Sequence, residues 1–257
     1  MYKQLLIRLL PMLLFVSTLQ AESSLLVDRE CKRIAGKLAS VSYRECLERR
    51  LIYSDGNSVK QAPILFRDYA AGPEKQQGRV LLIGGIHGDE YASVTIVFKW
   101  LALLDQYNAG LFHWRIVPLL NPDGLLQEKS QRLNANGRDL DRSFPVAPLQ
   151  ALPADVPEAQ WLAGVIQSFR PDVIVAIHAP HEVVDYASLE SGKYALQRLE
   201  VSPVDLANGS LSQYAANAGI PVLMVELPYA DIMPAADEVV AMWQDILNWV
   251  RTQTAVE

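Results

Sequence analysis

The hydrophobic positions of this chain alternate between two periods. Short apolar runs have the length of buried strands, and they lie between longer segments whose apolar residues recur at helical spacing. The predicted strands are Pro63–Tyr69, Val80–Ile83, His113–Leu120, Pro171–His178 and Ile220–Glu226. The predicted helices are the segment after Glu90, Glu158–Phe169, Gly209–Ala218 and Asp231–Arg251, and Leu25–Leu51 is expected to be largely helical, with Gly36 weakening it. This alternation predicts an α/β fold, with a mostly parallel or mixed central sheet and helices on both faces.

Two segments interrupt the pattern. The residues Ser54-Asp55-Gly56-Asn57 have the composition of a turn. A loop runs from Leu125 to Pro157 and is rich in Asn, Arg, Asp and Pro. Because a loop of that length within a compact domain is usually functional, we expect it to contribute to a site.

The N-terminus, residues 1–21, has the composition of a secretory signal peptide. Lys3 and Arg8 give a positive start, a short apolar stretch follows, and Ala21 is a plausible last residue before cleavage. The alternative is an uncleaved anchor, but the apolar stretch is short for a membrane span and contains Pro11. We therefore expect an exported protein, periplasmic or secreted, with no stable membrane span after signal removal.

Cys31 and Cys46 are the only cysteines of the chain. In an exported protein such a pair predicts a disulfide. Two buried thiols or two metal ligands are the alternatives, and ligation is the weakest because no histidine lies near them in sequence. The expected organisation is a signal peptide at 1–21, an N-terminal cap segment at 22–60 that the cysteines staple, and the main domain at 61–257.

Composition bounds the class of protein. The 257 residues are 50% hydrophobic and carry a formal net charge of −6, which fits one large globular domain. A mildly acidic chain lacks the basic character of proteins that bind nucleic acid, so we expect no nucleic-acid partner.

The first candidate chemistry follows the strand that begins at Val80. The strand ends at Gly84-Gly85, and His87 and Glu90 lie on the turn into the next helix. Ligand sites of open α/β sheets lie at this carboxyl end of the strands. Two such side chains on a tight turn can face one ion, and zinc accepts an imidazole and a carboxylate. The alternative is a histidine at a helix start with a solvated glutamate in the first turn.

Two further strands end in titratable residues, one in His178 and the other in Glu226. Because the carboxyl ends of parallel strands share one edge, His178 would join His87 and Glu90 as the third ligand of a catalytic zinc. Glu226 at the same edge would serve as general base toward a water molecule. Taken alone, Glu226 would be better interpreted as one half of a structural ion pair.

The loop from Arg132 to Pro145 carries several charges at fixed offsets. Arg132 and Arg142 are suited to a developing oxyanion and to a substrate carboxylate, because a guanidinium is permanently charged and binds bidentately. The alternative is a solvated, charged loop without a function.

Together these residues resemble the zinc carboxypeptidases of the carboxypeptidase A type. The resemblance covers the chain from about Pro63 to the last helix. It rests on motifs that occur in the family's order: His87-Gly88-Asp89-Glu90, Asn121-Pro122-Asp123-Gly124, the loop from Arg132 to Pro145, His178, and Val225-Glu226-Leu227-Pro228. Within the family the likeness is greatest to the bacterial murein peptide amidases, which share the His-Gly-Asp-Glu motif and an Asn-Ala-Asn-Gly loop. Those enzymes cut the γ-D-glutamyl–diaminopimelate amide of cell-wall peptides.

The resemblance implies a role for each matched residue. His87, Glu90 and His178 would hold one zinc ion per chain, and residues 61–257 would form the catalytic domain. Glu226 would activate the water, and Arg132 would polarise the scissile carbonyl and stabilise the oxyanion.

Three loop residues complete the implied site. Asp139 matches the aspartate that orients the first histidine ligand, and Arg142 matches the arginine that binds the substrate's terminal carboxylate. The family has asparagine where this chain has Asp141, and an ionised aspartate cannot donate a hydrogen bond to a carboxylate. We expect Asp141 either to accept from a substrate ammonium or to pair with Arg138 or Arg142. The resemblance assigns no role to His181.

The sequence thus predicts an exported zinc amidase or carboxypeptidase whose partner is a peptide, most simply a cell-wall muropeptide. One alternative is a small-molecule N-acyl amino acid deacylase like aspartoacylase or succinylglutamate desuccinylase, against which export and the Asn-Ala-Asn-Gly loop argue. Another is a non-catalytic peptide-binding relative, against which the complete set of ligands, Glu226 and Arg132 argues.

Overall fold

The structure, a computed structural model, describes residues 23–73, 75–146, 152–179, 195–199 and 208–255. The predicted signal peptide at 1–21 and His181 lie outside the described residues. Among the described residues, no helix combines the length and the apolar character that crossing a membrane requires.

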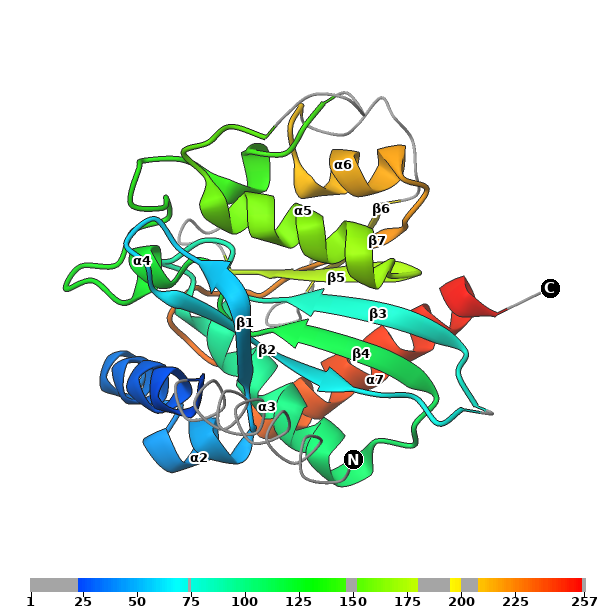
Figure 1. The fold of residues 1–257 in the computed structure, drawn as a ribbon. Coiled ribbons are helices and arrows are strands. Elements are labelled where there is room, and N and C mark those ends of the chain that lie inside the picture. Colours follow the sequence, from blue (N-terminus) through cyan, green and yellow to red (C-terminus); the bar gives the residue numbers. More distant parts are fainter. Residues whose placement is uncertain (1–22, 74, 147–151, 180–194, 200–207, 256–257) are drawn as a thin grey trace, which may run out of the picture.

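A seven-stranded mixed sheet forms the centre of the molecule (Figure 1). Its spatial order is β1-β2-β4-β3-β5-β7-β6. The strands are β1 Ile52–Asn57, β2 Pro63–Tyr69, β3 Gly78–Ile83, β4 Phe112–Val117, β5 Val173–His178, β6 Ala195–Leu199 and β7 Val222–Glu226. The four strands β4, β3, β5 and β7 run parallel, whereas β1, β2 and β6 pair antiparallel at the two sides. This arrangement confirms the predicted α/β fold.

Helices cover both faces of the sheet, as predicted (Figure 1). One face carries the helix over residues 23–37, α2 Tyr43–Glu48, α3 Tyr91–Tyr107 and α7 Ala236–Thr254. The other carries α5 Pro157–Phe169 and α6 Leu211–Asn217. Each face buries its own apolar core against the sheet, and every residue of the central strand β5 is buried. Burial on both faces explains why β5 reads as a continuous apolar run.

The N-terminal segment packs on α3 within the same core as the sheet. The predicted disulfide joins Cys31 to Cys46. The segment Leu25–Leu51 is largely helical, as predicted, but the chain forms two helices there, one at 23–37 and the separate α2. Ser42 starts α2 by accepting a hydrogen bond from the Glu45 backbone N–H, so a capping side chain within the segment divides it.

The predicted turn over Ser54–Asn57 is also wrong, because these residues belong to β1. Their pairing with β2 shifts register between Tyr53 and Asn57, so the turn-forming residues lie at an irregularity within the strand. The last helix begins at Ala236, later than the predicted Asp231. Pro234 explains the delay, since the residue before a proline avoids the helical region. The sequence pattern also left β6 unassigned.

Candidate active site

The turn between β3 and α3 places the first two predicted ligands. Gly85 adopts a positive φ of 57°, which glycine tolerates without strain. Its N–H donates to Ser93 Oγ at 3.2 Å, and that hydroxyl donates to the Glu90 carbonyl at 2.7 Å. The chain is thus folded back on itself, with His87 and Glu90 both buried at the end of the sheet.

The motif that begins at Asn121 supports this turn from the side. Gly88 lies against Gly124 of the short helix α4 Pro122–Leu125, where a Cβ on Gly88 would come within 2.3 Å of the Gly124 backbone. The Gly88 N–H and the Asn121 amide both donate to the Arg132 carbonyl, at 3.2 and 3.1 Å. Asn121 thereby fixes the start of the charged loop beside His87, a positioning role that the sequence reading did not assign.

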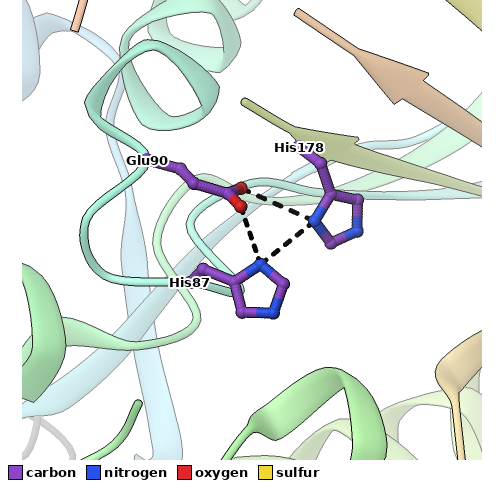
Figure 2. Close-up of side chains that lie close together, drawn as sticks. All are labelled: His87, Glu90 and His178. Atoms are coloured by element: carbon purple, nitrogen blue, oxygen red, sulfur yellow. Dashed lines mark hydrogen bonds and ion pairs between the residues drawn. The ribbon is translucent and has the colours of Figure 1, made fainter. Parts of the chain in front are cut away.

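Figure 2 shows His87, Glu90 and His178 pointing toward one another, the first two from the turn that follows β3 and His178 from the end of the neighbouring strand β5. The Nδ1 atoms of the two histidines are 3.2 Å apart. Glu90 Oε1 lies 2.9 Å from His87 Nδ1, and Oε2 lies 3.5 Å from His178 Nδ1. All three side chains are buried. The structure therefore brings the three predicted ligands together with their donor atoms converging.

This donor set fits a zinc ion. Ligand atoms bound tetrahedrally at zinc–nitrogen distances of about 2.0–2.1 Å are roughly 3.3 Å apart, close to the 3.2 Å between the two Nδ1 atoms. Two imidazole nitrogens and one carboxylate are the ligand types that a catalytic zinc takes. The described residues contain no other cluster of this kind.

A second layer of polar contacts holds the cluster. Asp139 Oδ1 lies 3.0 Å from His87 Nε2, the ring nitrogen that faces away from the cluster. Arg132 contacts Glu90 Oε1 at 3.3 Å through a terminal nitrogen and Asp139 Oδ2 at 3.5 Å through Nε. The N–H of Ala179 donates to Glu90 Oε2 at 3.0 Å. Asp139 and Arg132, both predicted from the loop, therefore lie at the site.

The electrostatics of the cluster favour a positive charge. Burial would lower the pKa of His87, but the hydrogen bonds that its ring makes to the Asp139 and Glu90 carboxylates outweigh burial and raise that pKa to about 9. Burial likewise opposes ionisation of Glu90, yet His178 and His87 hold its pKa well below the usual range. Carboxylates that stabilise positive charge between two buried rings are what an ion site requires.

Glu226 ends β7 in direct register with His178 of β5. Burial raises the pKa of the Glu226 carboxyl, and the charges of His178, Glu90, His87 and Asp141 also act on it. Its carboxylate forms no hydrogen bond or ion pair with any residue that the structure describes. The structural ion pair, the alternative interpretation of Glu226, is thus not observed in that part of the chain.

Asp141 and Arg142 lie in the 3₁₀ helix Leu140–Arg142. The Asp141 backbone N–H donates at 3.1 Å to Asp139 Oδ1, the oxygen that contacts His87, so Asp141 lies beside the site. Its negative charge contributes to the raised pKa of both His178 and Glu226. Neither Arg138 nor Arg142 pairs with it in the described structure, and Arg138 instead lies 3.6 Å from Asp155. The exposed Arg142 contacts none of the site residues within the described ranges.

The fold is the one that solved metallo-carboxypeptidases share. Among solved structures, a metallo-carboxypeptidase from Pseudomonas aeruginosa superposes with a TM-score of 0.59 at 15% identity, over 79% of this chain and 64% of that one. The murein-tripeptide amidase of Escherichia coli O157 gives a TM-score of 0.52 at 23% identity, over 76% of this chain and 90% of that one. These likenesses show a shared fold.

Sequence comparison gives the family. Residues 76–226, more than half of the chain, match the succinylglutamate desuccinylase/aspartoacylase catalytic domain, and the chain belongs to that family. Murein peptide amidase A of Escherichia coli K12 is 25% identical over 221 residues, which span 76% of this chain and 88% of the relative. The match begins before β3 and ends at Glu226, so it contains every proposed ligand.

Proposed function

We propose that this protein is an exported zinc-dependent amidase or carboxypeptidase that hydrolyses a peptide bond, or a γ-D-glutamyl–diaminopimelate-type amide, of cell-wall peptides. The observation that carries the proposal is the convergence of His87, Glu90 and His178 beside Glu226, a carboxylate that forms no pair with the described residues. The likeness to murein peptide amidase A supports the substrate. Residues 1–21 would direct export, and 61–257 would form the catalytic domain behind the cap at 22–60.

The chemistry divides between the ion and the chain. When bound by His87, Glu90 and His178, zinc would supply a Lewis acid that lowers the pKa of a water molecule. Glu226 would take the proton of that water and pass it to the leaving amine. Burial raises the pKa of this carboxyl, which brings a glutamate closer to the working pH of a general base.

Two further groups would act on the carbonyl and on the first ligand. Arg132 reaches the Glu90 carboxylate at 3.3 Å and is partly exposed, so its remaining N–H groups are available to a substrate oxygen. Such a donor stabilises the charge that develops on the carbonyl oxygen. Asp139, bonded to His87 Nε2, would fix the orientation of that ring.

We further propose that Arg142 and Asp141 read the free end of the substrate. Asp141 offers a negative group beside the site and the exposed Arg142 a positive group next to it in the chain. Neither side chain has a side-chain partner within the described residues. A stereocentre that carries both an ammonium and a carboxylate, as in diaminopimelate, complements such a pair.

The family match supports a second candidate. Succinylglutamate desuccinylase and aspartoacylase are named for small N-acyl amino acids, and their catalytic domain is the one matched at residues 76–226. A small-molecule deacylase would use the same ligands and Glu226, but it would have no need of a signal peptide.

One experiment separates these candidates from a non-catalytic binding protein. The purified chain is analysed for metal and then incubated with defined muropeptides, with N-succinylglutamate and with N-acetylaspartate. Stoichiometric zinc with release of diaminopimelate supports the proposal, and turnover of only the N-acyl amino acids supports the deacylase. Zinc without any turnover would indicate a binding protein, and absence of zinc binding would refute the ligand assignment.

A further inference from the structure

A buried carboxylate outside the site connects helix α5 to the charged loop. Glu158 is fully buried in the first turn of α5. Its Oε1 accepts from the Val59 N–H at 3.1 Å, and its Oε2 accepts from the Asn134 side-chain amide at 3.1 Å. No described cation pairs with it, so its charge is balanced only by N–H groups and by the helix start.

Asn134 connects Glu158 to the backbone of the loop through hydrogen bonds. Its Oδ1 accepts from the N–H groups of Asn136 and Arg138, both at 3.0 Å, and its own N–H donates to the Arg138 carbonyl at 2.9 Å. Its amide also reaches the Asp155 carbonyl at 3.4 Å. Asn134 therefore closes the turn that ends at Arg138, one residue before Asp139.

The turn lies between two fixed points of the site. At its start, the Arg132 carbonyl is held by the Gly88 N–H at 3.2 Å. At its end, Asp139 lies 3.0 Å from His87 Nε2. The position of Asp139 relative to His87 therefore depends on how Asn134 is anchored. Among the described residues, Glu158 is the one charged acceptor of the Asn134 amide.

The chemistry of Glu158 indicates that two acceptors are needed at this position. A carboxylate without a cation is costly to bury, and burial raises the pKa of this carboxyl. Glutamine would avoid that cost, but it offers only one acceptor oxygen, whereas Val59 and Asn134 each present a donor.

We propose that Glu158 is a positioning residue of the active site, which holds the Asn134 turn so that Asp139 can orient His87. The inference deepens the proposed function and rests on it, because Asp139 matters only if His87 binds metal. The competing interpretation is that Glu158 serves only to hold the loop between β1 and β2 through Val59.

A reciprocal exchange of donor and acceptor tests the proposal. Glu158→Gln retains an oxygen for the Val59 N–H but turns its amide toward the Asn134 amide, so that two donors face each other. Asn134→Asp retains acceptors for Asn136 and Arg138 but places a carboxylate against Glu158. The double variant E158Q/N134D restores one donor and one acceptor with the polarity reversed. The Val59 contact is the same in E158Q and in the double variant.

The measurements are zinc affinity by competition with a chromogenic chelator, kcat/KM, and the midpoint of thermal unfolding. We expect each single variant to weaken zinc binding and to lower kcat/KM by about tenfold, at the lower end of the effect of losing a contact behind a metal ligand. The double variant should recover both to within about threefold of the wild type. If the single variant N134D does not fold, the comparison of E158Q with the double variant still tests the proposal.

The matched control is Glu48→Gln, which removes the same charge from the half-exposed Glu48 of α2 and should leave zinc affinity unchanged. The proposal is overturned if the double variant is no better than E158Q. It is also overturned if the single variants lower only the unfolding midpoint while zinc affinity stays at the wild-type value. A wild type that binds zinc but cleaves no amide would instead refute the proposed function, and the zinc measurements would still test Glu158.

Discussion

Replacement of Asp141 by asparagine tests how the site reads its substrate. Asparagine has the same shape and keeps one acceptor oxygen, so the change removes mainly the charge. The Asp141 backbone N–H, which donates to Asp139 Oδ1 at 3.1 Å, is unaffected. Any loss of activity can therefore be assigned to the carboxylate and not to the 3₁₀ helix.

The magnitude follows from the exposure of the residue and from its partners. A hydrogen bond between charged groups contributes about 1.5–3 kcal/mol. Asp141 is half-buried and has no ion pair within the described residues, so its charge is available to a ligand but partly screened by solvent. We therefore expect the lower end, about 1.5 kcal/mol, which corresponds to roughly a tenfold loss of kcat/KM.

The assay compares two substrates of the same length, a muropeptide with the free amine of diaminopimelate and its des-amino analogue. The loss with Asp141→Asn should be confined to the substrate that carries the amine. Equal losses on both substrates would refute the reasoning and would mean that Asp141 supports the loop. Arg142→Gln is the companion variant, and it should weaken both substrates because both keep the terminal carboxylate.

Three further predictions concern the proposed ligands, the base and the disulfide. His87→Ala or His178→Ala should abolish stoichiometric zinc binding in metal analysis, because three ligands are the usual minimum protein set; wild-type affinity in either variant would disprove the ligand assignment. Glu226→Gln should retain zinc and substrate binding but lose most of kcat, since an amide cannot take the proton of water; substantial turnover would point to another base. Reduction of Cys31–Cys46, which lie 15 residues apart, should lower the free energy of unfolding by about 3 kcal/mol in denaturant titrations. An unchanged midpoint of the denaturant titration would show that the helices of the cap segment stay folded without the disulfide.

The parts of the fold that could be predicted are those whose burial leaves a continuous apolar pattern in the sequence. The strands β3 and β5 are buried on both faces, so their sequences are apolar along nearly their whole length. The start of α2 and the later start of α7 were missed although local residues explain both, Ser42 through its cap and Pro234 through its restriction of the preceding residue.

The parts that could not be predicted depend on distant partners. In β1, the residues 54–57 favour a turn locally, but pairing with β2 holds them in a strand. Trp161 of α5 also reaches this strand, and its indole N–H donates to Asp55 at 3.3 Å. The local sequence of β1 predicts neither the pairing with β2 nor the hydrogen bond from Trp161.

The residues of the site also divide into those that the sequence predicts and those that it does not. His87, Glu90, His178 and Glu226 could be found because parallel strands bring their carboxyl ends to one edge, a consequence of topology alone. Glu158 offers no such signal, because a glutamate in the first turn of a helix is ordinary on electrostatic grounds. Its importance emerges only when its two oxygens are seen to accept from segments 99 and 24 residues away in sequence.

The two histidines lie at the ends of neighbouring central strands, His87 on the turn after β3 and His178 at the last residue of β5, and this placement has a thermodynamic consequence. An ion held by both His87 and His178 ties together residues 91 positions apart, and so acts on the chain as a removable cross-link. Closing a long loop removes entropy from the unfolded chain, and a ligand that binds only the folded form stabilises it in proportion to the logarithm of its concentration. The thermal midpoint of this protein should therefore rise steadily with free zinc. Amide exchange should slow most in β3 and β5, the strands that the ion would join at the centre of the sheet.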